Sequence, residues 1–170
     1  PTADLGYGTK YYVEFAAEYA PFDILGLENL GRALDLHRMT GMIKVGQEAR
    51  SFQAVKALNG GFQAVNFADV RNGEDARECV RSVRAETPSV GGLRGVVQAR
   101  DSGHVREVGT PAWVRSTQRV VVAVMIEKKE AVESIEAILD VEGIDMVTFG
   151  PADYAMSLGF PGERPHPAVP

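Results

Sequence analysis

The sequence contains one cysteine, Cys79, and no apolar run long enough to span a membrane. A single cysteine excludes an internal disulfide and favours a reducing, cytoplasmic location. The formal net charge of −5 argues against the basic surface that nucleic-acid binding requires. Neither a G-x-G-x-x-G turn nor a P-loop is present, which disfavours a nucleotide-binding fold. We therefore expect a cytoplasmic protein that binds neither nucleic acids nor membranes.

Apolar runs do alternate with helix-periodic segments along the chain, which indicates a parallel sheet covered by helices. We predict a single domain, 1–170, in which the Gly- and Pro-rich segment 85–118 adds a short strand, GLRGVVQ, and an irregular excursion. The main strands fit either a doubly wound sheet or an arc of a (β/α)8 barrel, of which a complete copy takes about 250 residues. The strands are predicted at 11–19, 41–45, 64–70, 119–127 and 145–152, with helices in the connections 22–37, 49–61, 72–86 and 128–143.

Two acidic residues lie at the C-terminal ends of consecutive predicted strands, Glu127 after VVVAVMI and Asp153 after DMVTFGPA. Each acid alone is also typical of a helix N-terminus, where it acts as a cap or as a partner of the helix dipole. Consecutive parallel strands are usually neighbours, about 4.8 Å apart, so the pair can share one divalent cation such as Mg²⁺ or Mn²⁺. A cation with open positions would bind a chelating 2-oxo acid and stabilise its enolate.

Other residues are candidates for contacts with such a ligand. Lys44 ends an apolar strand, where its side chain either reaches the rim of the sheet or pairs with a substrate carboxylate. Glu14 and Glu18 share one face of the first strand, which predicts a polar barrel interior or an edge strand that faces solvent. Around Gly150 and Ala152 the side chains are small, so backbone N–H groups can approach an anion.

The stretch 124–162, VMIEKKEAVESIEAILDVEGIDMVTFGPADYAMSLGFPG, resembles the signature of the HpcH/HpaI aldolase family nearly position by position. Weaker similarity covers most of the remaining chain, for example in GMIKVGQE and GGFQAVNFADVRNGEDARECVRSVR. Members of this family are metal-dependent aldolases and lyases that act on 2-oxo acids. The resemblance implies that Glu127 and Asp153 bind Mg²⁺ or Mn²⁺ and that the fold is a (β/α)8 barrel. The first strand and the last two strands of that barrel would lie outside this chain.

The departures from the family pattern concern proton transfer and charge. The catalytic histidine of the family falls on Tyr19, the acid before it on Glu18, and an aspartate two residues earlier on Ala16. The arginine that binds the substrate carboxylate falls on Lys44, which keeps the charge but loses the two-pronged geometry. The predicted acid–base residues are therefore Tyr19, Glu14 and Glu18, and the predicted substrate contacts are Lys44, Gly150 and Ala152.

The leading interpretation is a metal-dependent carbon–carbon lyase that forms or cleaves a 2-oxo acid through a pyruvate-type enolate. Two alternatives stay open: a thioester lyase of the citrate-lyase or malyl-CoA type, and a metal- and carboxylate-binding protein without turnover. The thioester lyase requires a basic surface for CoA phosphates, and 85–118 contains only four arginines. We expect the full-length protein to be a homo-oligomer, and the isolated chain to be poorly soluble because open sheet edges associate.

Overall fold

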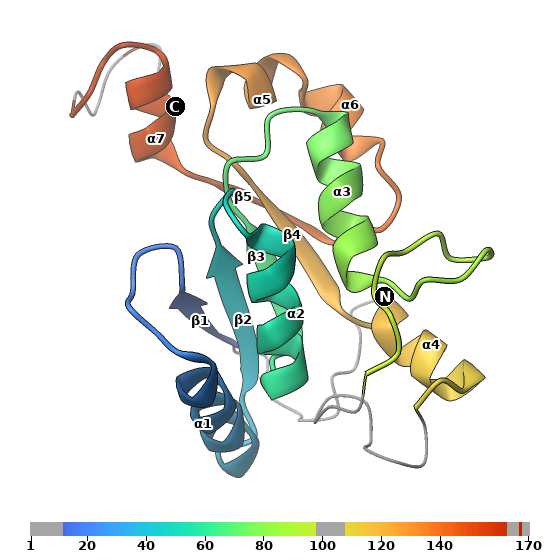
Figure 1. The fold of residues 1–170 in the computed structure, drawn as a ribbon. Coiled ribbons are helices and arrows are strands. Elements are labelled where there is room, and N and C mark those ends of the chain that lie inside the picture. Colours follow the sequence, from blue (N-terminus) through green and yellow to red (C-terminus); the bar gives the residue numbers. More distant parts are fainter. Residues whose placement is uncertain (1–11, 98–107, 163–166, 168–170) are drawn as a thin grey trace.

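The computed structural model describes residues 12–97, 108–162 and 167. Its centre is a parallel five-stranded sheet whose strands lie side by side in the order of the sequence (Figure 1). A doubly wound sheet reverses its strand order at a switch point. The observed order is that of an arc of a (β/α)8 barrel, which confirms the predicted fold. The strands are β1 (Tyr12–Ala16), β2 (Thr40–Val45), β3 (Ala64–Phe67), β4 (Val121–Ile126) and β5 (Met146–Phe149).

The crossover helices lie side by side in front of the sheet in Figure 1, and they pack in sequence order, α1 on α2, α2 on α3 and α3 on α6. Residues that point from the strands towards these helices, such as Ile43 and Val65, form the main core. Alternate residues point to the other face, where Met42, Ala64 and Ala123 form a separate small cluster. This second face corresponds to the interior of the barrel. The helices are α1 (Ile24–Leu36), α2 (Arg50–Gly60), α3 (Gly73–Val83) and α6 (Ile135–Leu139).

Local sequence features explain where these helices begin and how closely they pack. Asp23 caps α1 by accepting a hydrogen bond from the N–H of Gly26, and Asn72 caps α3 by accepting from two N–H groups of its first turn. Gly31 brings α1 against the end of α2, because a Cβ at this position would lie 1.9 Å from the carbonyl oxygen of Gly60. Gly61 ends α2 as its C-cap with a φ of 112°, which favours glycine, and the preceding Gly60 is the contact point for α1.

The segment 85–118 differs from its prediction, apart from 98–107, which lie outside the described residues. An additional helix, α4 (Pro111–Gln118), begins after the N-cap Thr110, with proline in its first turn. The predicted strand GLRGVVQ is reduced to one isolated bridge between Arg94 and Ala85. The reason is that the backbone of Arg94 pairs with Arg84, at the end of α3, instead of with a sheet strand.

The predicted helix over 128–143 is also not continuous. It is divided at Ser134, whose φ of −106° and ψ of 16° leave the helical region, into α5 (Lys129–Glu133) and α6. A final short helix, α7 (Pro151–Ser157), follows β5 and carries Asp153 in its first turn. Within the part of the chain that the structure describes, no helix is both long enough and apolar enough to cross a membrane.

Candidate active site

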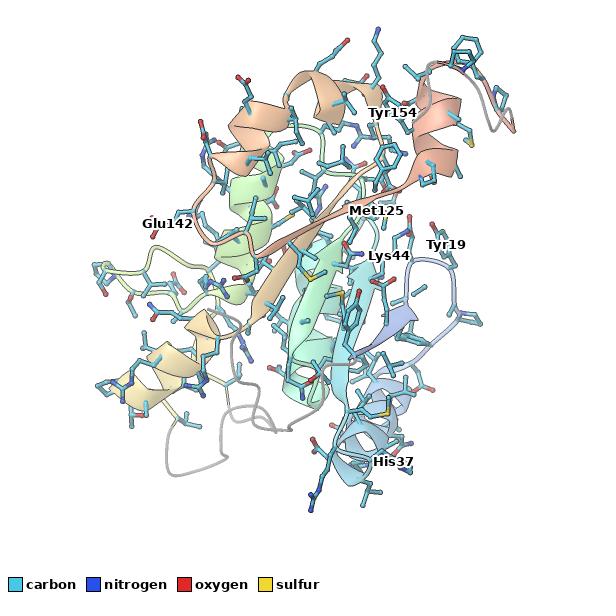
Figure 2. All side chains as sticks on the ribbon, turned by 180° about the vertical axis from the view of Figure 1, so that it is seen from behind. Tyr19, His37, Lys44, Met125, Glu142 and Tyr154 are labelled. Carbon is cyan, nitrogen blue, oxygen red and sulfur yellow. The ribbon has the colours of Figure 1, made fainter. Side chains whose placement is uncertain are left out.

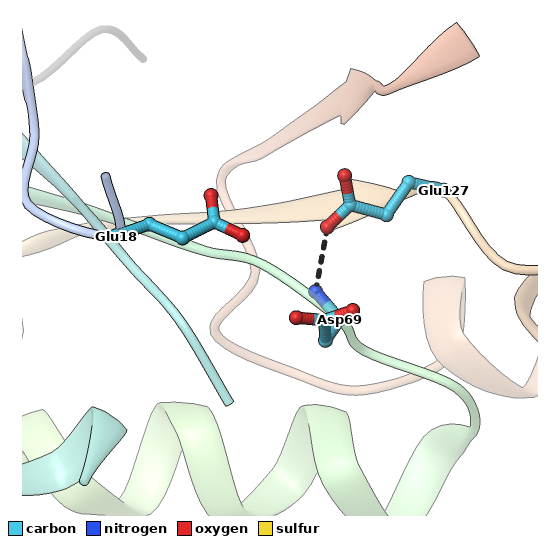
Figure 3. A group of neighbouring side chains, drawn as sticks. All are labelled: Glu18, Asp69 and Glu127. Atoms are coloured by element: carbon cyan, nitrogen blue, oxygen red, sulfur yellow. Dashed lines mark hydrogen bonds between the residues drawn. The ribbon is translucent and has the colours of Figure 1, made fainter. Parts of the chain in front are cut away.

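Three carboxylates meet at the C-terminal edge of the sheet (Figure 3). Glu18 lies in the turn after β1, Asp69 follows β3, and Glu127 follows β4. One oxygen atom from each side chain lies within 4.8 Å of the other two. Parallel strands bring their C-terminal ends to one edge, so residues that are distant in the sequence converge here.

Glu127 is the most deeply buried member of this group, with 1% of its surface exposed. Its Oε1 accepts a hydrogen bond from the backbone N–H of Asp69 at 2.8 Å, drawn as the dashed line in Figure 3. Burial raises the pKa of Glu127, and the opposing effects of the Asp69 N–H and of Lys44 are smaller. The desolvated carboxylate would therefore be stabilised by a cation that binds beside it.

The donor atoms of this group fit a hard divalent cation. Mg²⁺ and Mn²⁺ bind carboxylate oxygens and keep several water molecules, so they need few protein ligands. Glu18 and Asp69 are half-buried and Glu127 is buried, which partly shields the three oxygens from bulk water. The chemistry and the spacing of these side chains are thus compatible with the metal that the sequence predicts.

Asp153, the second predicted ligand, lies beside this group but is connected to it through a lysine. The Lys128 ammonium is 2.8 Å from Oδ1 of Asp69 and 3.3 Å from Oδ1 of Asp153. Burial lowers the pKa of Lys128, but the two aspartates raise it by more, so the net shift is upward. The structure therefore places Glu127 and Asp153 at the same edge, and their joint role as metal ligands stays a prediction.

Lys44 forms a second charged cluster at the end of β2, where only 5% of its surface is exposed. Its ammonium lies 2.5 Å from Oε2 of Glu18 and donates a hydrogen bond to the hydroxyl of Tyr19 at 2.8 Å. Burial lowers the pKa of Lys44, but Glu18 and Tyr19 more than compensate, and the net shift is upward. Figure 2 shows Lys44 and Tyr19 next to each other on the side of the sheet away from the helices. Lys44 is thus an internal ion-pair partner and does not extend to the solvent-exposed rim.

Glu14, on β1, points to the same barrel-interior face as Lys44 and lies further from the C-terminal edge of the sheet. Its Oε2 accepts a hydrogen bond from Nδ2 of Asn66 at 3.1 Å. The Asn66 Oδ1 in turn accepts from the Thr148 hydroxyl at 3.2 Å. A polar chain therefore runs across the interior face from β1 through β3 to β5. The structure pairs Glu14 with Asn66. Glu14 thus combines the two predicted environments, because it is exposed on an edge strand and is also hydrogen-bonded to a residue of the barrel interior.

Gly150 connects β5 to α7 next to Glu127, and Ala152 follows it within α7. A Cβ at position 150 would lie 2.5 Å from Oε2 of Glu127, so only glycine lets the backbone pass this close to the buried carboxylate. Ala152 is exposed in the first turn of α7. The contact explains why glycine is required at position 150, and the role of both residues in substrate binding stays a prediction.

Three residues of this site were not singled out by the sequence: Asp69, Lys128 and Asn66. Asp69 had a detectable signal, because it is an acid at the end of a predicted parallel strand, like Glu127. Its φ of 56° turns the chain sharply there, which directs its backbone N–H towards Glu127. Lys128 and Asn66 gave no such signal, since a lysine before a helix and an asparagine within a strand occur in many structural contexts.

A parallel barrel arc with its acidic residues gathered at the C-terminal strand ends is typical of barrel enzymes, whose active sites lie at that face. The chain belongs to the HpcH/HpaI aldolase/citrate lyase family, whose model matches residues 27–170. The resemblance noted in the sequence is thereby confirmed. This is a family of aldolases and lyases, and the specific reaction of the present chain is a separate question.

Individual relatives agree with this assignment. A hydroxypyruvate/pyruvate aldolase of Sagittula stellata is 30% identical over 138 residues, which are 81% of this chain and 53% of that protein. The crystal structure of an HpcH/HpaI aldolase/citrate lyase family protein from Burkholderia cenocepacia matches with a TM-score of 0.82 and 26% identity, over 95% of this chain and 63% of that one. A citrate synthase structure matches with a TM-score of 0.73 and 25% identity, over 89% and 56%. The chain thus spans between 53% and 63% of the length of these relatives.

Proposed function

We propose that this protein contributes the active site of a divalent-metal-dependent carbon–carbon lyase that acts on a 2-oxo acid. The observation that carries the proposal is Glu127, a buried carboxylate whose pKa is raised and which faces two further carboxylates at the C-terminal edge of a barrel. The pyruvate-aldolase name of the relative from Sagittula stellata supports a pyruvate-type substrate.

In this proposal Glu127 and Asp153 hold Mg²⁺ or Mn²⁺, and Asp69 and Glu18 provide further negative charge close by. The metal would supply the Lewis acid that stabilises an enolate oxygen. Ala152, in the first turn of α7, would present its backbone N–H to the ligand, and Gly150 leaves room for that approach because it has no side chain. The N–H of Gly150 itself donates to the carbonyl oxygen of Ile126 at 3.0 Å.

Lys44 would provide the positive charge for the substrate carboxylate. In the structure this charge is shared by Glu18 and the Tyr19 hydroxyl, so a substrate carboxylate would have to replace or join Glu18 beside it. Burying the ammonium in advance fixes its position, which favours binding of a ligand of opposite charge.

Tyr19 is suited to donate a proton rather than to accept one. The hydrogen bond from Lys44 lowers its pKa, but burial and the negative charge of Glu18 together outweigh that effect, and the net shift is upward. The phenol is therefore protonated at neutral pH. Glu18, within reach of Lys44 and next to Tyr19, would be the group that receives a proton, and Glu14 is further removed through its bond to Asn66.

A thioester lyase is the second candidate, because a citrate synthase structure shares the fold at 25% identity. A 2-oxo acid lyase and a thioester lyase can use the same metal-bound enolate. They differ in whether added acyl-CoA is consumed, so a coupled assay with acetyl-CoA and with aldehydes separates them.

The central test is exchange of the methyl protons of pyruvate with deuterium in the presence of Mn²⁺, followed by NMR. We expect exchange with the full chain, and a loss of about 100-fold or more in Glu127→Gln and Asp153→Asn. Glu133→Gln is the matched control, because Glu133 is an exposed acid that pairs with the exposed Lys129. Tight metal binding without any exchange would instead support a binding protein without turnover.

The proposal also includes a cytoplasmic location and assembly into a homo-oligomer. The lone thiol of Cys79 supports the first, since a reducing compartment preserves free thiols. The edge strands β1 and β5 support the second, because within the described residues no strand pairs with their outer sides, and unpaired strand edges tend to associate. Sedimentation of the full-length protein would show the oligomeric state.

A further inference from the structure

Lys128 occupies an unusual position among the charged groups of the site. Its ammonium bridges Asp69, at the end of β3, and Asp153, in α7, at 2.8 Å and 3.3 Å. Its side chain is 19% exposed, as is that of Asp69, so the Lys128–Asp69 pair is largely shielded from water. Asp69 is also one of the three carboxylates that converge on Glu127. The lysine therefore lies against the carboxylates to which a metal is assigned.

The neighbouring Lys129 shows that this position is not simply a result of local sequence. The Lys129 ammonium points outward, where it lies 3.6 Å from Glu133, and its side chain is 54% exposed. The backbone of Lys128 is extended, with φ −122° and ψ 149°, and it precedes the first turn of α5. Because the backbone is extended at Lys128 and helical from Lys129 onward, the two consecutive side chains point in different directions, that of Lys128 into the site and that of Lys129 into solvent.

We propose that Lys128 is a resident cation that competes with the divalent metal for Asp69 and Asp153. This inference rests on the proposed metal site and specifies how that site is regulated. An ammonium at hydrogen-bond distance from two carboxylate oxygens fills the space in which a metal, about 2.0–2.6 Å from such oxygens, would lie. Two cations so close together repel each other strongly, so metal binding to Asp153 requires the ammonium to leave.

The structure allows this exchange. Lysine carries its charge on a flexible stem of four carbons, and the Lys128 side chain is at the edge of the sheet, so its ammonium can move to solvent without unfolding. When it is in place it neutralises part of the acidic cluster and links α7 to the end of β3. The metal-free site thus keeps its arrangement, at the cost of weaker metal binding.

The test is the affinity of the full chain for Mn²⁺ alone, measured by isothermal titration calorimetry and by the loss of the free-ion EPR signal. We expect Lys128→Met to bind Mn²⁺ more tightly, by about tenfold or more, which lies within the range of about 5–150-fold that is typical when one binding event in a protein affects another. Lys129→Met is the matched control and should bind as the wild type does. Lys128→Arg keeps the charge and should remain as weak as the wild type.

Equal or weaker Mn²⁺ binding by a folded Lys128→Met would overturn the inference and leave the proposed metal site standing. Absence of Mn²⁺ binding in both wild type and variant would overturn the metal site as well. Circular dichroism checks the fold, and Lys128→Gln provides a polar replacement in case the methionine variant aggregates. A readout based on affinity also separates this role from one in catalysis, which would change the exchange rate without changing binding.

Discussion

The two sides of the site both place a lysine among carboxylates, but they do so at different depths. On the β1–β2 side, the Lys44 side chain is 6% exposed and is held by Glu18 and Tyr19. On the β3–β5 side, the Lys128 side chain is 19% exposed and bridges Asp69 and Asp153. A buried ammonium depends on its partners, because water cannot replace them, whereas a partly exposed one can exchange them for water. The first lysine is therefore a fixed element of the fold and the second a replaceable ion.

The largest expected effect tests this difference through stability. Lys44→Met should lower the free energy of unfolding by about 3 kcal/mol, because it leaves the half-buried Glu18 without its cation. Lys128→Met should change it by less, about 1 kcal/mol, because the Lys128 ammonium is itself partly hydrated and its second partner, Asp153, is 36% exposed. Urea denaturation of the metal-free proteins measures both values. Similar losses in the two variants would contradict the comparison.

A smaller effect is expected for Glu127, which lies between the two sides. Its pKa is raised in the folded protein, so the folded state binds this proton more tightly than the unfolded state does. Stability from this group is complete below the ordinary glutamate pKa of about 4.3 and is lost as the pH rises through the raised value. Glu127→Gln cannot ionise, and the metal-free variant should therefore melt about 2–4 °C higher than the wild type at neutral pH, which corresponds to about 1 kcal/mol.

The same measurement at acidic pH supplies the control. Below the ordinary carboxyl pKa both proteins carry a neutral side chain at position 127, and the difference in melting temperature should disappear. Adding Mn²⁺ at neutral pH should reverse the order, because the wild type gains a ligand that binds only its folded state. A variant that is less stable than the wild type at every pH would show that burial does not penalise this carboxylate.

The sequence allowed much of the fold and part of the site to be predicted. Apolar periodicity located all five strands, and their predicted ends differ from the observed ones by a few residues because strand ends turn towards the site, as at Asp69. Glu127 was found because it ends an apolar strand. The ion pairs of Lys44 and Lys128 could not be predicted, because they depend on how neighbouring strands and α7 are placed in space. The missed helix α4 had a recognisable Thr–Pro start, which was outweighed by the irregular composition around it.

The smallest predicted effect concerns the polar chain that joins the two sides. Thr148→Val removes the donor to Oδ1 of Asn66, a residue that is 1% exposed, and should cost about 0.5–1 kcal/mol because this oxygen is left without its hydroxyl partner. Glu14→Ala removes the acceptor at the other end of this series of hydrogen bonds, where Glu14 accepts from Nδ2 of Asn66. If a change in the orientation of the Asn66 amide affects both of its hydrogen bonds, the stability losses of Thr148→Val and Glu14→Ala should not add. The coupling energy should then reach about 0.5 kcal/mol in a double-mutant cycle.

Glu28→Ala provides the reference pair for that cycle, since Glu28 is an exposed acid on α1 that pairs with Arg32. Its loss and that of Thr148 should add within about 0.3 kcal/mol, as is usual for distant sites. Coupling in the first cycle and none in the second would mean that Asn66 joins the side with Glu14 to the side that carries the metal ligands. Full additivity in both cycles would instead mean that the sheet holds two independent charged clusters, and that metal exchange at Lys128 proceeds without any response at Lys44.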